Sequence, residues 1–158
     1  MSILRIGVIV SYQILSTITL LTFSGCFDVR ENVEADKMNT AIEDELKTIQ
    51  TPLTASYIRS NTVQKDNLGV VGKTYRTSLT YPELRTYYDA ELERRGWRFT
   101  REKKLQYDHQ DRGQYHVFYC KGKYTAHLEY AGGLEDTFGW TYSVAVSWGM
   151  TEPGVTCR

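Results

Sequence analysis

Two histidines, His116 and His127, are the side chains of this sequence best suited to proton transfer or metal binding. Both fall in segments predicted to be neighbouring strands, so they could approach each other across a hairpin. A zinc site needs three or four ligands in a fixed geometry, and Cys120 or Glu129 could contribute to one. Because no metal-binding motif of a known kind accompanies the pair, we interpret both residues as half-exposed strand histidines. The sequence therefore predicts no metal site.

The other polar clusters contain no catalytic motif. Residues 108–111 (Asp-His-Gln-Asp) lack the further oxygen ligands of a calcium loop, and this segment and the pair Glu135-Asp136 are both typical of solvated turns. The sequence has no Gly-x-Ser-x-Gly elbow, no phosphate-binding glycine loop and no His-Glu-x-x-His motif. We therefore predict no catalytic residue and no cofactor. These absences argue against an enzyme without excluding one.

The N-terminal stretch points to a covalent modification. Arg5 is the only Lys or Arg before Cys26, residues 6–23 are mostly apolar, and Ser24-Gly25 place small residues before the cysteine. This is the order of a secretory signal peptide. The segment ending in Ser-Gly-Cys resembles the lipobox of bacterial lipoprotein precursors, with Phe23 where Leu is commonest. The resemblance covers residues 1–26. It implies cleavage before Cys26, a diacylglycerol on the Cys26 thiol and a fatty acyl chain such as palmitate on the freed amine.

An uncleaved transmembrane helix is the alternative interpretation of this stretch. A spanning helix needs about 20 mostly apolar residues. Here the run is interrupted by Ser11, Tyr12, Gln13, Ser16, Thr17, Thr19 and Thr22. We favour the lipoprotein, which two or more acyl chains would anchor stably without a span. The expected location is the bacterial cell membrane or outer membrane, facing the periplasm or the exterior. Asp28, rather than residue 27, is the first acid after the cysteine, which favours the outer membrane in a Gram-negative host.

With Cys26 assigned to lipid, Cys120 and Cys157 remain as an even pair in an oxidising compartment. A disulfide between them would join the C-terminal tail to a strand and stabilise the fold by roughly 3–4 kcal/mol. Two independent thiols are the alternative.

Charge and composition limit the classes of partner. The chain has 19 Lys and Arg against 19 Asp and Glu, whereas a nucleic-acid-binding domain would need a basic excess. We therefore predict no nucleic-acid partner. The densest basic cluster could meet lipid headgroups or an anionic partner, but a helix end followed by the solvated face of a strand is the simpler interpretation. It comprises Arg94, Arg95, Arg98, Arg101, Lys103 and Lys104.

Two helices are predicted. Residues 33–50 carry one apolar stripe at spacings of four, four and three, formed by Met38, Ile42, Leu46 and Ile49. We expect this stripe to dock on the domain, with recruitment of a partner helix as the alternative. The second helix begins at Thr80, where Glu83 can complete a capping box and Pro82 lies in the first turn. It ends at Gly96 and carries on one face Leu84, Tyr87, Tyr88 and Leu92.

Strand periodicity follows Gly96. The predicted strands are residues 70–79, 97–103, 114–121, 123–131 and 139–148. The last alternates most clearly, with one face formed by Trp140, Tyr142, Val144, Val146 and Trp148. Lys121-Gly122-Lys123 predicts a tight hairpin, and residues 53–69 are interpreted as a turn or short strand followed by a loop. The expected fold class is α+β: an antiparallel meander sheet of four to five strands, a capped helix packed on one face and an N-terminal helix.

The helix-to-strand junction carries a second, weaker resemblance. The run Tyr87-Tyr88-x₃-Leu92-x₃-Gly96-Trp97 resembles one in small, mostly uncharacterised bacterial envelope lipoproteins. This resemblance implies helix-to-strand packing and no particular chemistry.

The predicted organisation is a signal peptide (1–25), a tether with an amphipathic helix (26–51) and an α+β domain (52–158). The predicted function is that of a lipid-anchored cell-envelope protein, a non-catalytic protein-interaction or assembly module. Its expected partners are the membrane, through lipid on Cys26, and another envelope protein. The alternative is an envelope hydrolase or a small-ligand-binding lipoprotein. A deep concavity lined by His116, His127 or acids would favour the alternative, and a flat or filled sheet face the interaction module.

Overall fold

The computed structural model describes residues 33–150 and 152–158, all within the compact unit Glu31–Arg158. The predicted signal peptide and the predicted lipid attachment at Cys26 lie outside the described residues. Along the chain the elements are α1 (Val33–Thr48), β1 (Ser56–Lys65), β2 (Leu68–Arg76), α2 (Tyr81–Arg94), β3 (Arg98–Tyr107), β4 (Gln110–Lys121), β5 (Tyr124–Tyr130), η1 (Gly132–Leu134), α3 (Glu135–Phe138) and β6 (Tyr142–Trp148). The α+β class is therefore confirmed.

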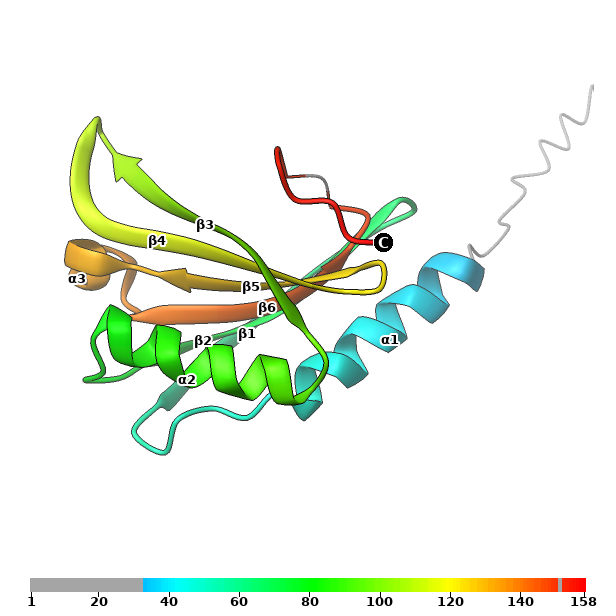
Figure 1. Cartoon of the computed structure of the whole chain (residues 1–158), viewed down its shortest axis with the longest axis horizontal. Helices are drawn as coiled ribbons and strands as arrows, with labels where there is room; N and C mark the ends of the chain where they lie inside the picture. Colours follow the sequence, from blue (N-terminus) through cyan, green and yellow to red (C-terminus); the bar gives the residue numbers. More distant parts are fainter. Residues whose placement is uncertain (1–32, 151) are drawn as a thin grey trace, which may run out of the picture. The chain divides into compact units, whose positions relative to one another are not determined.

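The strands form one antiparallel sheet in the order β1-β2-β6-β5-β4-β3, with α1 and α2 on the same face (Figure 1). Strands β3 to β6 are the predicted meander, and Gly122 at the β4–β5 hairpin has a φ of 53°, a conformation that glycine adopts easily. The prediction of four to five strands was one short, because β1 was not recognised. Every residue of β1 is exposed, so this strand has no alternation between apolar and polar residues. Asn61 and Gly69, interpreted as loop residues, lie in β1 and β2.

The main core lies between the sheet and the two helices. As predicted, α1 docks on the sheet, mainly over β2 and β6. The helix buries Met38, Ile42 and Leu46, and Ile49, directly after its last residue, is buried as well. Trp148 Nε1 donates a hydrogen bond of 2.8 Å to the side-chain oxygen of Asn39, which ties β6 to α1. Gly69 lies against this pair, and any side chain there would collide with both partners. The glycine is thus required for the close approach of α1 to β2.

The second helix begins as the sequence predicts. Thr80 and Glu83 form the capping box, in which the Glu83 carboxylate accepts a hydrogen bond of 2.8 Å from the Thr80 amide. Gly96 follows the helix with a φ of 82°. The buried face of α2 packs on the sheet through Leu84, Tyr88 and Leu92, while Tyr87 is only partly buried.

The segment before β6 differs from the prediction. Residues 132–138 form the short helices η1 and α3 rather than an open loop, and β6 begins at Tyr142 rather than at residue 139. Gly139, with a φ of 76°, ends α3. Trp140 therefore stacks on Phe138, with ring centroids 5.3 Å apart, instead of joining the strand. The predicted face of β6 is otherwise correct, since Tyr142, Val144 and Val146 are buried in the core.

The C-terminal tail runs back over the face of the sheet that carries no helix (Figure 1). Cys157 lies at disulfide distance from Cys120 of β4, as predicted, with Cα atoms 5.2 Å apart. Lys103 of β3 donates to Glu152 at 3.3 Å, and Arg101 donates to the carbonyl oxygen of Pro153. The tail is thus held to both β4 and β3.

Candidate functional site

The helix-free face of the sheet has a hollow that contains both predicted histidines. We call it the histidine hollow; its volume is about 200 Å³. It is lined by residues of β1, β2, β6, β5 and β4 and by Met150, which follows β6. Its lining comprises Asn61, Val63, Val70, Gly72, Lys73, His116, His127, Glu129, Ser143, Ala145 and Met150. The hollow is smaller than the 300–1,000 Å³ typical of drug-sized ligand sites, so it suits only a small ligand or a single side chain.

The two histidines contact each other across the hairpin, but the prediction that both are half-exposed is wrong for His127, which is buried. His116 and His127 are not directly opposite in the register, since His127 pairs with Phe118, yet His116 Nε2 lies 3.2 Å from His127 Nδ1. His127 Nε2 lies 2.6 Å from the hydroxyl of Ser147, which donates to the Thr125 carbonyl oxygen. If the serine proton goes to that carbonyl, His127 Nε2–H donates to the serine and His127 Nδ1 accepts from His116. The hydrogen bonds therefore all run the same way: each group donates to the next, from His116 at the hollow to the Thr125 carbonyl oxygen in the interior.

Burial keeps the two histidines of this hydrogen-bond chain uncharged at neutral pH. Desolvation, with a smaller contribution from His116, lowers the pKa of His127 to about 3. Desolvation also lowers the pKa of His116, against the opposing pull of Glu129 and Glu152. Ser147 is fully buried, so its hydroxyl cannot be reached by a substrate. The arrangement is that of a satisfied hydrogen-bond chain rather than an activated nucleophile.

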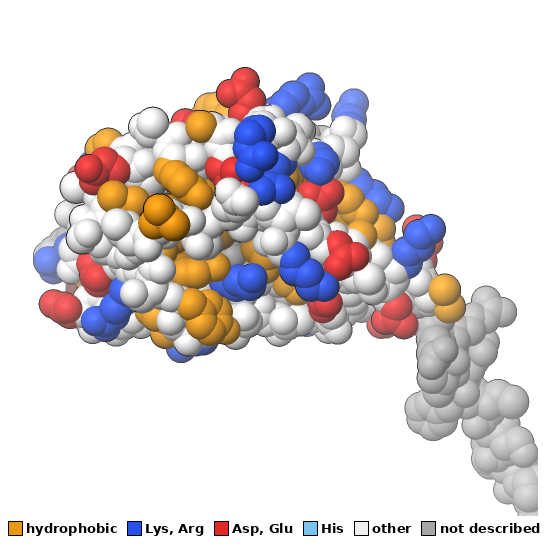
Figure 2. Space-filling model, turned by 90° about the horizontal axis from the view of Figure 1, so that it is seen from below, with side chains coloured by type: hydrophobic (Ala, Val, Ile, Leu, Met, Phe, Trp, Pro, Cys, Tyr) orange, Lys and Arg blue, Asp and Glu red, His pale blue; other side chains and the backbone are white. Residues whose placement is uncertain are grey.

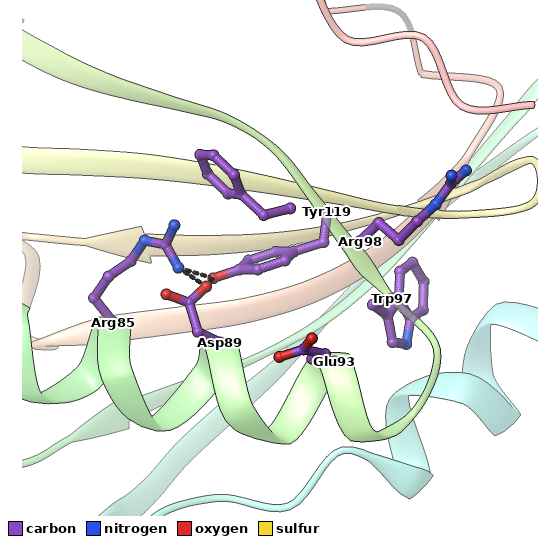
Figure 3. A pocket seen from close by; sticks show the side chains of 7 residues that line it. Arg85, Asp89, Glu93, Trp97, Arg98 and Tyr119 are labelled. Carbon is purple, nitrogen blue, oxygen red and sulfur yellow. Dashed lines mark hydrogen bonds and ion pairs between the residues drawn. The ribbon is translucent and has the colours of Figure 1, made fainter.

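A second cleft, of about 480 Å³, lies on the helix side between α2 and the strands β3 and β4 (Figure 3). Arg85 projects from α2 toward the hydroxyl of Tyr119 on β4 and donates to it at 2.7 Å. The same hydroxyl donates to Asp89 at 3.0 Å, and Arg85 also pairs with Asp89 and Glu102. The guanidinium lies 4.6 Å from the ring centroid of Phe99. These groups satisfy one another, so the network fixes α2 to the sheet. No sequence pattern predicts this network, because its residues share no motif.

Four of the six residues in the basic cluster form ion pairs. Arg94 and Arg95 pair with Glu91, at 2.6 Å and 2.5 Å. Lys103 pairs with Glu152, and Lys104 pairs with Asp111. On the side seen in Figure 2, basic and acidic side chains are interspersed. This supports the interpretation of the cluster as a helix end and a solvated strand face.

The two edges of the sheet differ in charge. The edge strand β3 carries Arg98, Arg101, Glu102, Lys103 and Lys104, and charged residues of this kind protect an edge from pairing with another chain. The opposite edge strand, β1, has the uncharged run Ser60–Gln64 in regular register with β2, and its only bulge precedes this run. Exposed apolar residues of β1 are Tyr57, Ile58 and Val63. Strand β1 therefore offers an unprotected edge.

Hollows lie on both faces of the sheet beside this run. The histidine hollow reaches Asn61 and Val63 on the helix-free face. On the helix face, a hollow of about 160 Å³ between α1 and the sheet is lined in part by Ser60, Thr62 and Leu46. Since side chains of a strand alternate between the two faces, a strand added to β1 would direct its side chains toward both hollows.

The described part of the chain has no group of three or more His, Cys, Asp and Glu side chains that could hold a metal ion. Among the same residues, no helix is long and apolar enough to cross a membrane. No protein-family model, no curated protein and no solved structure matches this chain.

Proposed function

We propose that this protein is a lipid-anchored, non-catalytic protein-interaction module of the bacterial cell envelope, and that edge strand β1 is its binding element. The partner would supply an extended segment that pairs with β1 as an additional strand. In this mode of recognition, main-chain hydrogen bonds provide affinity and the pockets for alternate side chains provide specificity.

The observation that carries the proposal is the contrast between the two edges. Strand β3 carries its charges from Arg98 to Lys104, whereas the centre of β1 is uncharged, exposed and regular. An exposed, regular edge run without charges is a site of strand pairing, and Ser60–Gln64 is such a run between Arg59 and Lys65. The hollows on both faces beside Ser60–Val63 add places for the partner's side chains.

The anchor part of the proposal depends on the sequence. Ser24-Gly25-Cys26 supports lipid attachment at Cys26, and only six residues, 27–32, separate that cysteine from the start of α1. A fully extended chain of this length reaches roughly 20–25 Å. The module would thus remain close to the membrane surface, at the inner or outer membrane.

The alternative prediction, an envelope hydrolase, has less support. The serine that contacts a histidine is Ser147, which is fully buried. The small-ligand alternative has a specific observation in its favour, because the histidine hollow is lined by His116, His127 and Glu129.

Two experiments test the proposed function. Mass spectrometry of the native protein should find a mature chain that begins at a triacylated Cys26; an intact leader or a bare thiol would refute the anchor. A photo-crosslinking amino acid placed at Thr62 or Gln64 in growing cells should give one reproducible protein adduct. The comparison position is Thr100, at a bulge of edge strand β3, which should give none. Equal crosslinking from both edges would refute the role of β1.

A further inference from the structure

The carboxylate of Glu129 is the most unusual group in the histidine hollow. Glu129 lies on β5, and its side chain is 43% exposed. It accepts a hydrogen bond of 3.2 Å from the hydroxyl of Ser143 on β6. Its other contact is His116 Nε2, at 3.8 Å. Among residues 33–150 and 152–158, no Lys or Arg forms an ion pair with it. The hollow thus contains a carboxylate without a permanent cation.

The neighbouring groups do not neutralise Glu129. His116 is held neutral at pH 7 because burial lowers its pKa, and the charged groups that act on it are Glu129, Glu152 and Lys103. Lys103 is paired with Glu152. Lys73 also lines the hollow. Side-chain directions alternate along β2, so Lys73 lies on the opposite face from Gly72 and on the same face as Val71. Val71 is part of the core on the helix side. The Lys73 side chain therefore leaves β2 on the helix side, whereas Glu129 lies on the helix-free face.

The rest of the hollow is largely apolar. Its walls include the side chains of Val63, Val70, Ala145 and Met150. Gly72 forms part of the floor, where an added Cβ would lie 3.0 Å from the Cβ of Ala145. A bulkier residue at either position would therefore take up space in the hollow. A carboxylate and a hydroxyl beside apolar walls match a ligand with a cationic head and a short alkyl body.

We propose that the histidine hollow binds a small organic amine, whose ammonium group contacts Glu129 and the Ser143 hydroxyl while its alkyl part lies on the apolar walls. The ammonium supplies three donors, and the carboxylate and the hydroxyl supply acceptors. The volume of about 200 Å³ limits the ligand to a short alkylamine. The polar end of this site lies on β4, β5 and β6, and only its other end, at Asn61 and Val63, is shared with the proposed strand addition at β1, so amine binding can be tested without a partner strand.

The test uses the full-length protein in detergent micelles, titrated with n-butylamine at pH 7. Binding is followed by calorimetry and by the imidazole NMR signals of His116. We expect saturable binding with a Kd on the order of 1 mM. The neutral isostere 1-butanol and the anion butyrate should bind at least about tenfold more weakly, since a charged hydrogen bond is lost.

Two variants locate the site. Glu129→Gln keeps the shape of the side chain and removes its charge, so the affinity for n-butylamine should fall at least about tenfold. Ala145→Leu should reduce binding by filling the hollow. The matched control, Glu93→Gln in the cleft on the helix side, should bind as the wild type does. Three results would each overturn the proposal: no saturable binding, equal binding of 1-butanol, or unchanged binding by Glu129→Gln. None of them bears on crosslinking from β1, so failure here is distinguishable from failure of the proposed function.

Discussion

Cys157 of the C-terminal tail lies at disulfide distance from Cys120 of β4, with their Cα atoms 5.2 Å apart. The pair joins the last residues of the chain to the middle of the sheet, where Cys157 also contacts the hydroxyl of Thr125 at 3.2 Å. Met150, which precedes the tail, also lines the histidine hollow.

The first prediction concerns this pair. The double variant Cys120→Ser/Cys157→Ser should lower the free energy of unfolding by roughly 3–4 kcal/mol, because the unfolded chain regains the entropy of a closed loop. Urea denaturation measures the change. Reductant should lower the stability of the wild type by a similar amount and leave the variant unaffected. A wild type insensitive to reductant would show that the thiols are not bonded.

The capping box of α2 gives the second prediction. Thr80→Ala should lower the free energy of unfolding by about 1 kcal/mol, because the helix start loses its N-cap side chain. The control is Ser78→Ala, two residues earlier in an exposed loop position, which should change stability by less than about 0.5 kcal/mol. Thermal and urea denaturation of both variants provide the comparison, and equal effects would contradict a capping role.

The third prediction concerns the cleft between α2 and the sheet. Tyr119→Phe removes the hydroxyl that accepts from Arg85 and donates to Asp89. Stability should fall by about 1–2 kcal/mol, because a partly buried guanidinium loses a partner. Tyr107→Phe is the matched control, since Tyr107 is a largely exposed tyrosine at the end of β3. If the two variants unfold at the same urea concentration, the network does not stabilise the fold.

The fourth prediction is a pH dependence. His127 has a folded pKa of about 3, below its ordinary value of 6.5, so its contribution to stability is complete above pH 6.5. That contribution is lost as the pH falls from 6.5 toward 3, at up to about 1.4 kcal/mol per pH unit. In His127→Gln, the unfolding free energy should therefore fall less steeply over this pH range, and the remaining decrease is the part due to His116. His109→Asn, at an exposed turn, should keep the wild-type slope; an unchanged slope in His127→Gln would refute the assignment.

Local signals in the sequence predicted most of the fold. The stripe of α1, the capping box at Thr80 and the alternation from Tyr142 to Val146 each depend on residues close in the chain. These signals act through helix periodicity, end chemistry and strand alternation. The stripe, the capping box and the alternation are all present in the structure. The α1 stripe and the residues Tyr142, Val144 and Val146 are buried, as predicted.

The elements that were missed lack such signals. Strand β1 is exposed on both faces, and its pairing with β2 provides the only reason for its conformation. The contact of Arg85 with Tyr119 joins residues 34 positions apart, and no spacing rule connects them. The approach of His116 to His127 was foreseen as possible from the hairpin alone, but the involvement of Ser147 depends on β6 pairing beside β5.

The most direct test of the proposed function is the effect of an edge charge on crosslinking. A photo-crosslinking amino acid at Ser60 is combined with Thr62→Lys on β1, or with Thr100→Lys on β3 as the matched control. Because a lysine protects an edge strand from pairing, we predict that Thr62→Lys lowers the yield of the partner adduct by about tenfold or more and that Thr100→Lys leaves it unchanged. An adduct of equal yield in the two variants would contradict strand addition at β1.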